Sequence, residues 1–166
     1  MSNNQHKQKV NDDYPTPIHI WRDIEQYIPK DKKIWCPFYC DGNHTLKDLG
    51  FDIIHENKDF FKYEPEDYDL TVDNPPFSIK KQVCERLMKL GKPFIMIMPV
   101  STLCYQYFKP IADDIQLIIP PKRYNFAPQL GSSCSFDCLF FCYKMGLDKD
   151  IINLKWAHRT AWYIHF

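Results

Sequence analysis

With 166 residues, the chain has about the length of one compact domain. Its 45% hydrophobic and 16% aromatic residues exclude an intrinsically disordered chain, and the balance of 21 basic against 21 acidic residues excludes a general electrostatic attraction to polyanions. The seven cysteines form no CxxC pair, which argues against a disulfide framework and a zinc site, so we expect reduced thiols and no bound metal.

The first 13 residues, MSNNQHKQKVNDD, are polar, show no periodicity and lack the apolar stretch of a signal peptide. We therefore expect a mobile tail over residues 1–13 and a single domain over residues 14–166. Because no run approaches the ~18 apolar residues of a membrane span, the sequence predicts a protein of the cytoplasm or of the interior of a host cell, neither secreted nor bound to a membrane.

The first regular pattern follows this tail, where apolar residues at helical spacing predict an amphipathic helix over residues 17–28 with Pro17 in its first turn. Short apolar runs then alternate with helical patterns. The expected strands cover residues 33–37, 52–55, 68–73, 94–99, 116–119 and 136–144. The expected helices between them cover residues 45–49, 79–90 and 103–111.

This alternation of strands and helices predicts an α/β fold in which helices cover both faces of a mostly parallel sheet. The last two expected strands differ from the others because no helical pattern separates them. We therefore expect them to be antiparallel neighbours at one edge of the sheet.

The segment Asp73-Asn74-Pro75-Pro76-Phe77 directly follows an expected strand, at the position where ligand sites form in open α/β sheets. The two prolines fix the backbone and end the strand. The Asn74 amide oxygen and the Pro75 carbonyl can both accept hydrogen bonds from one amino group, and Phe77 can stack on a planar ring. The pattern favours a site for an aromatic amine, and the alternative is a strand that simply ends in a turn.

Asn74-Pro75-Pro76-Phe77 resembles the catalytic motif of amino-methyltransferases, which reads (D/N/S)PP(Y/F/W) in N6-adenine enzymes. Upstream, residues 33–42 (KIWCPFYCDG) resemble the cofactor loop of phage and viral adenine methyltransferases, which reads roughly EPFYGDG. The resemblance implies a Rossmann-like class I methyltransferase fold, S-adenosyl-L-methionine as the cofactor, and Asn74, Pro75, Pro76 and Phe77 as catalytic residues. The sequence departs from the family at Cys36, where a carboxylate is usual, and in having a single glycine in the loop.

The same resemblance implies a set of cofactor contacts. In the loop they are Pro37, Phe38, Tyr39, Asp41 and Gly42, and in the preceding Tyr-Pro-Thr-Pro segment they are Tyr14 and Thr16, with Asn74 added from the motif. Thr16 has an alternative role as a helix cap.

Acidic residues after the second expected strand complete the predicted cofactor site. Glu56 ends that strand, where a carboxylate can accept both hydroxyls of a ribose. Asp59 and Phe60 follow at the spacing at which the resembled family contacts the adenine amino group and ring of the cofactor. The alternative is that Glu56 and Asp59 are ordinary loop carboxylates.

Residues 120–126 (PPKRYNF) resemble a loop that offers an aromatic face and a cation to a flipped base or its phosphate. With Phe77, the resemblance thus implies Lys122, Arg123, Tyr124 and Phe126 as substrate-binding residues. Stacking on an exposed aromatic is worth roughly 1 to 3 kcal/mol per base. The alternative is a hydrophobic hairpin tip packed onto the core.

These motifs predict methyl transfer from S-adenosyl-L-methionine to the exocyclic N6 of adenine in DNA. Three alternatives stay open: an adenine in RNA, a glutamine amide in a protein, and a catalytically inactive binding partner that keeps the methyltransferase fold. The expected partner is nucleic acid, with DNA favoured over RNA. Because the core uses most of the chain, we expect target recognition to come from a homo-oligomer or a separate target-recognition subunit.

Overall fold

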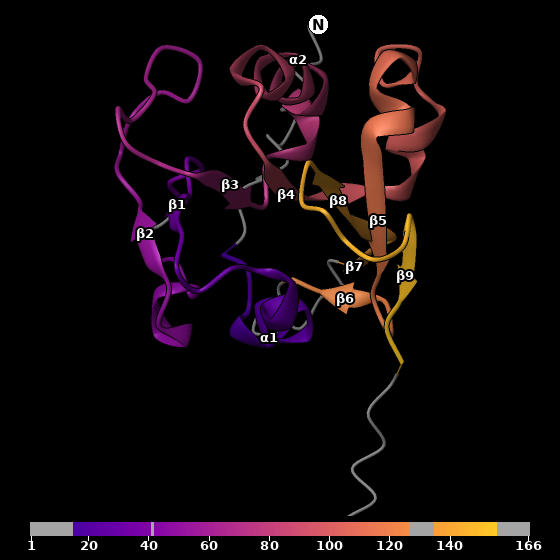
Figure 1. The fold of residues 1–166 in the computed structure, drawn as a ribbon, viewed down its shortest axis with the longest axis horizontal. Coiled ribbons are helices and arrows are strands. Elements are labelled where there is room, and N and C mark those ends of the chain that lie inside the picture. The colour runs from indigo at the N-terminus through magenta and orange to yellow at the C-terminus, as the bar shows by residue number, and fades with distance from the viewer. Residues whose placement is uncertain (1–14, 41, 127–134, 156–166) are drawn as a thin grey trace, which may run out of the picture.

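The computed structural model describes residues 15–40, 42–126 and 135–155, and a seven-stranded mixed sheet forms its centre (Figure 1). The strand order is β2-β1-β3-β4-β8-β5-β9. The strands are β1 (Lys33–Trp35), β2 (Asp52–Ile54), β3 (Leu70–Asp73), β4 (Phe94–Pro99), β5 (Ile115–Ile119), β8 (Cys138–Tyr143) and β9 (Ile151–Asn153). Strands β6 (Tyr124–Asn125) and β7 (Ser135–Phe136) pair separately as an antiparallel two-stranded sheet.

The sheet confirms the expected Rossmann-like α/β fold, because every neighbouring pair is parallel except those made by β8. β8 is the antiparallel neighbour of β5, as the sequence predicts. It lies inside the sheet between β4 and β5, however, and not at an edge. The strand at this edge of the sheet is β9, which runs parallel to β5 and is too short and too exposed to give a sequence signal.

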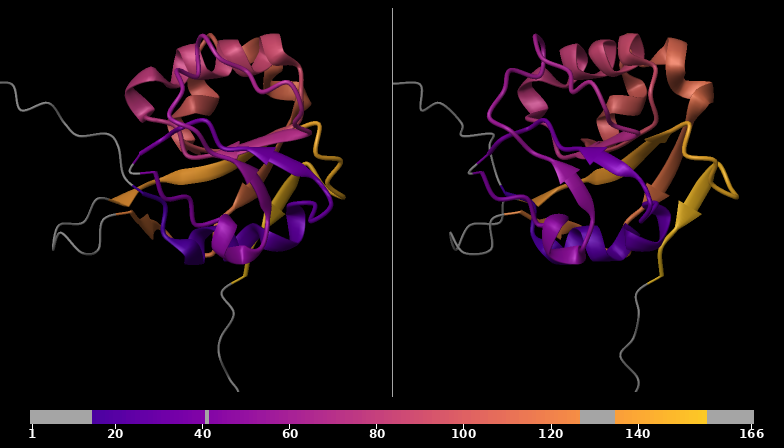
Figure 2. Two further views of the ribbon diagram at one scale, coloured as in Figure 1. Left: turned by 90° about the vertical axis from the view of Figure 1, so that its left-hand side faces the viewer. Right: turned by 60° about the vertical axis from the view of Figure 1, so that its left-hand side comes forward.

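Helices cover both faces of the sheet (Figures 1 and 2). One face carries α1 (Ile18–Ile24), which continues as the 3₁₀ helix η1 (Glu25–Tyr27). The other face carries α2 (Lys80–Leu90) and the 3₁₀ helices η4 (Val100–Cys104) and η5 (Lys109–Asp114), which replace the single helix expected over residues 103–111. Two further 3₁₀ turns, η2 (Lys47–Leu49) and η3 (Phe77–Ile79), lie in the connections.

The core is divided into two clusters because side chains alternate between the faces of each strand. On β4, Ile95 and Ile97 pack with the α1 residues Trp21 and Ile24. The intervening β4 residues, Phe94, Met96 and Met98, pack on the opposite face with the α2 residues Val83, Cys84 and Leu87. Both faces of the central strands are therefore buried, which holds the carboxyl end of β3, where all four residues are buried, in a fixed position.

The described residues contain neither a candidate membrane span nor a candidate metal cluster. None of their helices has the length and apolar character needed to cross a membrane. No cluster of three or more histidine, cysteine, aspartate or glutamate side chains suited to a metal ion occurs among them.

Candidate functional site

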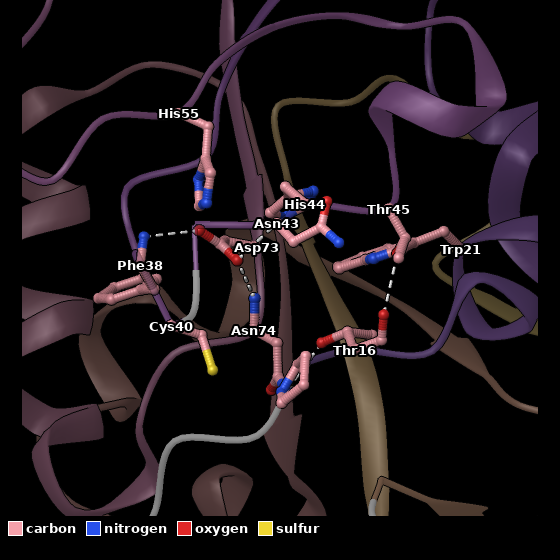
Figure 3. A pocket seen from close by; sticks show the side chains of 11 residues that line it. Thr16, Trp21, Phe38, Cys40, Asn43, His44, Thr45, His55, Asp73 and Asn74 are labelled. Atoms are coloured by element: carbon pink, nitrogen blue, oxygen red, sulfur yellow. Dashed lines mark hydrogen bonds and ion pairs between the residues drawn. The ribbon is translucent and has the colours of Figure 1, made fainter.

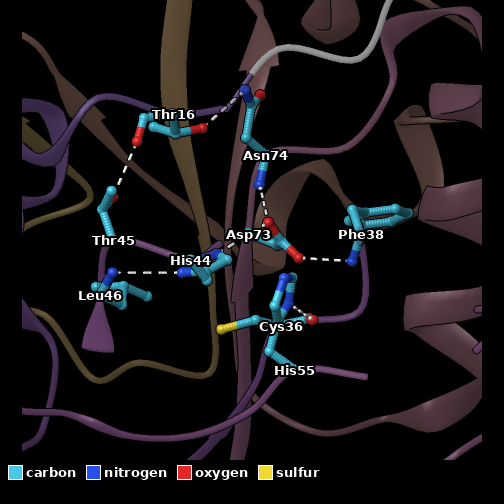
Figure 4. A network of polar contacts seen from close by, with 9 residues as sticks. All are labelled: Thr16, Cys36, Phe38, His44, Thr45, Leu46, His55, Asp73 and Asn74. Carbon is cyan, nitrogen blue, oxygen red and sulfur yellow. Dashed lines mark hydrogen bonds and ion pairs between the residues drawn. The ribbon is translucent and has the colours of Figure 1, made fainter. Parts of the chain in front are cut away.

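The candidate site lies where the segments after β1 and β3 meet. These strands are parallel neighbours, paired at Ile34↔Leu70 and Trp35↔Thr71, so their carboxyl ends reach the same edge of the sheet. The buried carboxylate of Asp73, the last residue of β3, joins the two segments (Figure 4). Its Oδ2 accepts a 2.8 Å hydrogen bond from the backbone N–H of Phe38, and its Oδ1 accepts one of 2.8 Å from the N–H of Asn74.

His44 donates a third hydrogen bond to Asp73. The backbone N–H of Leu46 donates to Nδ1 of His44 (3.4 Å), so the imidazole proton is on Nε2, which lies 3.2 Å from Asp73 Oδ1. The His44 ring also stacks on Trp21 of α1, with ring centroids 5.7 Å apart. Asp73 therefore connects the β1 loop, the motif after β3 and the first helix.

The side chain of Asn74 is held by Thr16. Its Nδ2 donates a 3.1 Å hydrogen bond to the Thr16 hydroxyl, and the Thr16 carbonyl accepts one of 2.9 Å from the Thr45 hydroxyl. Thr16 does not cap α1, because Pro17 occupies the N-cap position and no described side chain bonds there. With Nδ2 engaged, Oδ1 of Asn74 is buried and accepts no hydrogen bond from the described residues.

His55, directly after β2, was not expected from the sequence to belong to the site. Its Nδ1 donates a 2.8 Å hydrogen bond to the carbonyl of Cys36, and its ring stacks on Tyr39 with centroids 4.9 Å apart. Its Nε2 is buried and has no hydrogen-bond partner within the described part of the chain. His44 and Asp73 were missed for the same reason as His55: their roles follow from contacts between distant segments.

Two cavities open beside these residues. The smaller, of about 20 Å³, is lined by Thr16, Trp21, His44, His55, Asp73 and Asn74, among others (Figure 3). Since ~10–15 Å³ suffices for one water molecule, this cavity has room for one water-sized group. The larger cleft, of about 320 Å³, is lined by Pro37, Phe38, Tyr39, Asp59, Phe60 and Pro76, among others. Phe38 lines both, so the two are adjacent.

Most of the cofactor contacts expected from the sequence are thus close to one of the cavities. Glu56 is an exception: it is not among the described residues that line them, and its carboxylate accepts a 2.8 Å hydrogen bond from the Tyr63 hydroxyl. Tyr14 and Asp41 lie outside the described residues. Gly42 has a φ of 82°, and an added Cβ would come within 2.5 Å of the Tyr39 hydroxyl, so the loop requires glycine here.

Asp59 and Phe60 differ in exposure. Asp59 is on the surface and accepts a 2.9 Å hydrogen bond from the N–H of Phe61, which is the main reason that its pKa is lowered. The carboxylate therefore stays ionised as an acceptor at the rim of the cleft. Phe60 is buried, with its ring 5.0 Å from that of Phe38 and 5.5 Å from that of Trp35.

The structure contradicts the expected aromatic face at residues 120–126. Tyr124 and Phe126 are each only 2% exposed and belong to the core cluster under α1. The Tyr124 hydroxyl donates a 2.6 Å hydrogen bond to Asp23, so the ring is anchored inward. The alternative of a hairpin packed onto the core is therefore the observed one. Lys122 and Arg123 remain exposed, and Arg123 pairs with Asp137 at 3.1 Å.

An exposed aromatic side chain occurs instead near the Asn-Pro-Pro-Phe motif. Tyr105, just after η4, is 43% exposed and stacks on Tyr107 with ring centroids 5.4 Å apart. Lys80 Nζ lies 5.2 Å from the centre of the Tyr105 ring and donates a 3.2 Å hydrogen bond to the carbonyl of Phe77. Through Lys80, the Tyr105 ring is positioned beside the motif.

Comparisons with known proteins show a similarity at the level of structure. No protein-family model matches the sequence, and no curated protein matches it. Among solved structures, the chain is similar to the methyltransferase subunit of a type I restriction-modification system from Streptococcus thermophilus, with 11% sequence identity and a TM-score of 0.42. The match covers 85% of this chain and 47% of that chain, so the present chain spans about half the length of that subunit.

Proposed function

We propose that the protein is an S-adenosyl-L-methionine-dependent methyltransferase that methylates the exocyclic N6 nitrogen of adenine in DNA. The observation that carries this proposal is the side-chain oxygen of Asn74, which is buried and accepts no hydrogen bond from any described residue. An unpaired buried acceptor costs about 1–3 kcal/mol, so a ligand that brings an N–H donor to it removes that cost. The exocyclic amino group of adenine is such a donor.

The orientation of the Asn74 amide supports a role in the reaction. Because Nδ2 is bonded to Thr16, the oxygen cannot exchange places with the nitrogen without losing that hydrogen bond. Pro75 and Pro76 fix the backbone that follows, so the Pro75 carbonyl is a second acceptor of defined direction. Two preorganised acceptors would stabilise the positive charge that develops on the amino nitrogen as it attacks.

The larger cleft suits the cofactor. Its volume of about 320 Å³ falls in the usual range for small-molecule sites, about 300–1,000 Å³. The ionised Asp59 can accept a hydrogen bond from the adenine amino group of the cofactor, and Phe60 lies in the wall of the cleft. Glu56 is the candidate for the ribose, since a carboxylate accepts about four hydrogen bonds and Tyr63 supplies one.

Bound S-adenosyl-L-methionine would supply a methyl group on a positively charged sulfonium. Transfer of this methyl group to the amino nitrogen would leave the sulfur as a neutral thioether and would release one amino hydrogen to solvent as a proton. Asn74 and Pro75 orient the nitrogen, and this orientation supplies much of the acceleration without a strong base. The catalytic set is completed by Pro76, which lines the cleft, and by Phe77.

A planar base is favoured over a glutamine amide because aromatic side chains flank the motif. Phe77 begins η3 directly after the prolines, and Tyr105 presents an exposed ring nearby. In duplex DNA the base must be flipped out at a cost of a few kcal/mol, which stacking on such rings offsets. The exposed cations of Lys122 and Arg123 are candidates for phosphate contacts.

The proposal is tested by incubating the protein with methyl-labelled S-adenosyl-L-methionine and, in parallel, DNA, RNA and a glutamine-containing peptide. We expect N6-methyldeoxyadenosine in nucleosides from the DNA by mass spectrometry. Asn74→Ala should remove this signal, whereas the matched surface variant Asn153→Ala on β9 should keep it. Label in RNA or in the peptide would show that the substrate is RNA or a glutamine amide and not DNA. Cofactor binding without label in any substrate would support an inactive binding partner.

A further inference from the structure

The small cavity contains a second buried acceptor whose chemistry is defined by its surroundings. Nδ1 of His55 must carry a proton, because it donates to the carbonyl oxygen of Cys36 at 2.8 Å. In the neutral ring, Nε2 is then an acceptor, and it has no hydrogen-bond partner among the described residues. Stacking on Tyr39 and an edge contact with His44, at centroid distances of 4.9 and 5.1 Å, hold the ring in place.

The neighbours of His55 make this cavity suited to a cation. Asp73 lines it with a carboxylate that accepts three hydrogen bonds from described residues, namely Phe38, Asn74 and His44, whereas a carboxylate offers about four acceptor positions. Cys36 adds no charge, because burial, and next the charge of Asp73, raise the pKa of its thiol well above the ordinary value. The negative charge beside His55 therefore comes from Asp73.

We propose that His55 and Asp73 bind the α-ammonium group of the methionine portion of S-adenosyl-L-methionine, an inference that rests on the proposed function. An ammonium group is water-sized, matches the cavity of about 20 Å³, and brings up to three N–H donors to acceptors that need them. Phe38 lines both cavities, so the smaller cavity lies beside the larger cleft that the rest of the cofactor would occupy.

The arrangement also separates the two amino groups that the site would bind, one from the cofactor and one from the target base. Figures 3 and 4 show the Asp73 carboxylate between the His55 ring and the Asn74 amide. His55 therefore takes the cofactor amine, and Asn74 remains available for the target amine. Asp73 would repel the carboxylate of the methionine portion, so the cavity selects the ammonium end.

Calorimetric titration with two ligands tests the inference: S-adenosylhomocysteine, and its analogue that lacks only the α-amino group. We expect the parent protein to bind S-adenosylhomocysteine more tightly. His55→Phe, which keeps a flat ring, should weaken S-adenosylhomocysteine binding by about tenfold to a hundredfold and change the affinity for the deaminated analogue less than about twofold. His55→Gln, which restores an acceptor and a donor, should recover most of the loss.

A measurement on the parent protein avoids dependence on the folding of a variant. In protein labelled with ¹⁵N-histidine, Nε2 of His55 should have the chemical shift of an unprotonated nitrogen, and this shift should move with S-adenosylhomocysteine but not with the deaminated analogue. Equal affinity of the parent for both ligands, or equal weakening of both by His55→Phe, would overturn the assignment while leaving the proposed function intact. Failure of the parent to bind either ligand would overturn the proposed function itself.

Discussion

The amide of Asn74 donates a 3.1 Å hydrogen bond to the hydroxyl of Thr16, a residue 58 positions earlier in the chain. This contact decides which end of the amide is left as a buried acceptor. If the oxygen acts on the transition state, Asn74→Ala should lower the methyl-transfer rate a hundred- to thousandfold, because removal of one preorganised hydrogen-bonding group costs about 3–4 kcal/mol. Single-turnover kinetics and cofactor titration measure the two effects separately.

Cofactor affinity should change far less than the rate in Asn74→Ala. Pro75, Pro76 and Phe77 preserve the turn, and urea unfolding of the variant controls for the fold. A folded variant that binds cofactor and methylates within about threefold of the parent would remove the assigned role, since this difference corresponds to under about 0.7 kcal/mol.

Thr16 should act through Asn74. Thr16→Val keeps the shape of the side chain but removes the hydroxyl that accepts from Nδ2, so the amide loses its fixed orientation. We expect a rate about tenfold lower, which corresponds to the ~1.4 kcal/mol typical of one hydrogen bond, and recovery in Thr16→Ser. A parent-like rate in Thr16→Val would show that the Thr16 hydroxyl does not orient the amide.

Tyr105 should contribute to nucleic-acid binding. Its exposed ring lies beside Lys80, which contacts the carbonyl of Phe77. Tyr105→Ala should weaken binding of an adenine-containing oligonucleotide by about tenfold, because stacking is worth roughly 1–3 kcal/mol per base. Fluorescence anisotropy measures the change, and Tyr105→Phe is the matched control that keeps the ring. An unchanged affinity in Tyr105→Ala would exclude this ring from the interface.

Tyr124, in contrast, should affect stability and not catalysis. Tyr124→Phe removes the hydroxyl that bonds Asp23 at 2.6 Å, so the free energy of unfolding should fall by about 1–2 kcal/mol. Methylation at a temperature where the variant is folded should equal that of the parent. A loss of methylation without a loss of stability would indicate that Tyr124 belongs to the substrate site.

Buried thiols should make the protein sensitive to alkaline pH. Burial raises the pKa of Cys84, Cys138 and Cys142 to about 12. In the unfolded chain these thiols lose protons near pH ~8.5, whereas the folded protein retains them, so the unfolded state is favoured as pH rises. The free energy of unfolding should be constant below pH ~8.5 and fall between pH ~8.5 and 12, by up to ~1.4 kcal/mol per pH unit for each thiol.

Urea unfolding between pH 7 and 10.5, about the range in which the unfolded thiols titrate, measures this slope. Cys142→Ala should reduce it, because this variant removes one of the buried groups. The exposed Cys104 provides the matched control, and Cys104→Ala should leave the slope unchanged. If Cys142→Ala leaves the slope unchanged, the alkaline sensitivity comes from the buried tyrosines and not from this thiol.

The sequence predicts the fold well because the fold depends on local patterns. The expected strand at residues 94–99 coincides with β4, and the Asn-Pro-Pro-Phe motif follows β3 as expected. The burial of Tyr124 was not predictable, because its partner Asp23 lies 101 positions earlier. The sequence of a loop does not specify whether an aromatic ring points to solvent or into the core, nor which residues it packs against.

His44 and His55 show the same limit within the site. Each histidine is an isolated residue in the sequence, and its role comes from hydrogen bonds that fix one tautomer, between His44 and Asp73 29 positions away and between His55 and Cys36 19 positions away. The presence of Cys36 where the resembled family has a carboxylate can also be interpreted only from the structure. Its neutral side chain lies close to a carboxylate that the chain supplies from the end of β3.

The place of β8 inside the sheet imposes an order on assembly. β8 pairs with β4 through six residue pairs, from Phe94↔Tyr143 to Pro99↔Cys138, and with β5 on its other side. Strands β1 to β4 can pair with one another as soon as they are synthesised, but β5 must wait until residues 138–143 have been added between it and β4. During translation, the nascent chain would therefore form the edge that carries the candidate site while one side of β4 is still unpaired. That unpaired side is the position where a chaperone or another chain would attach first.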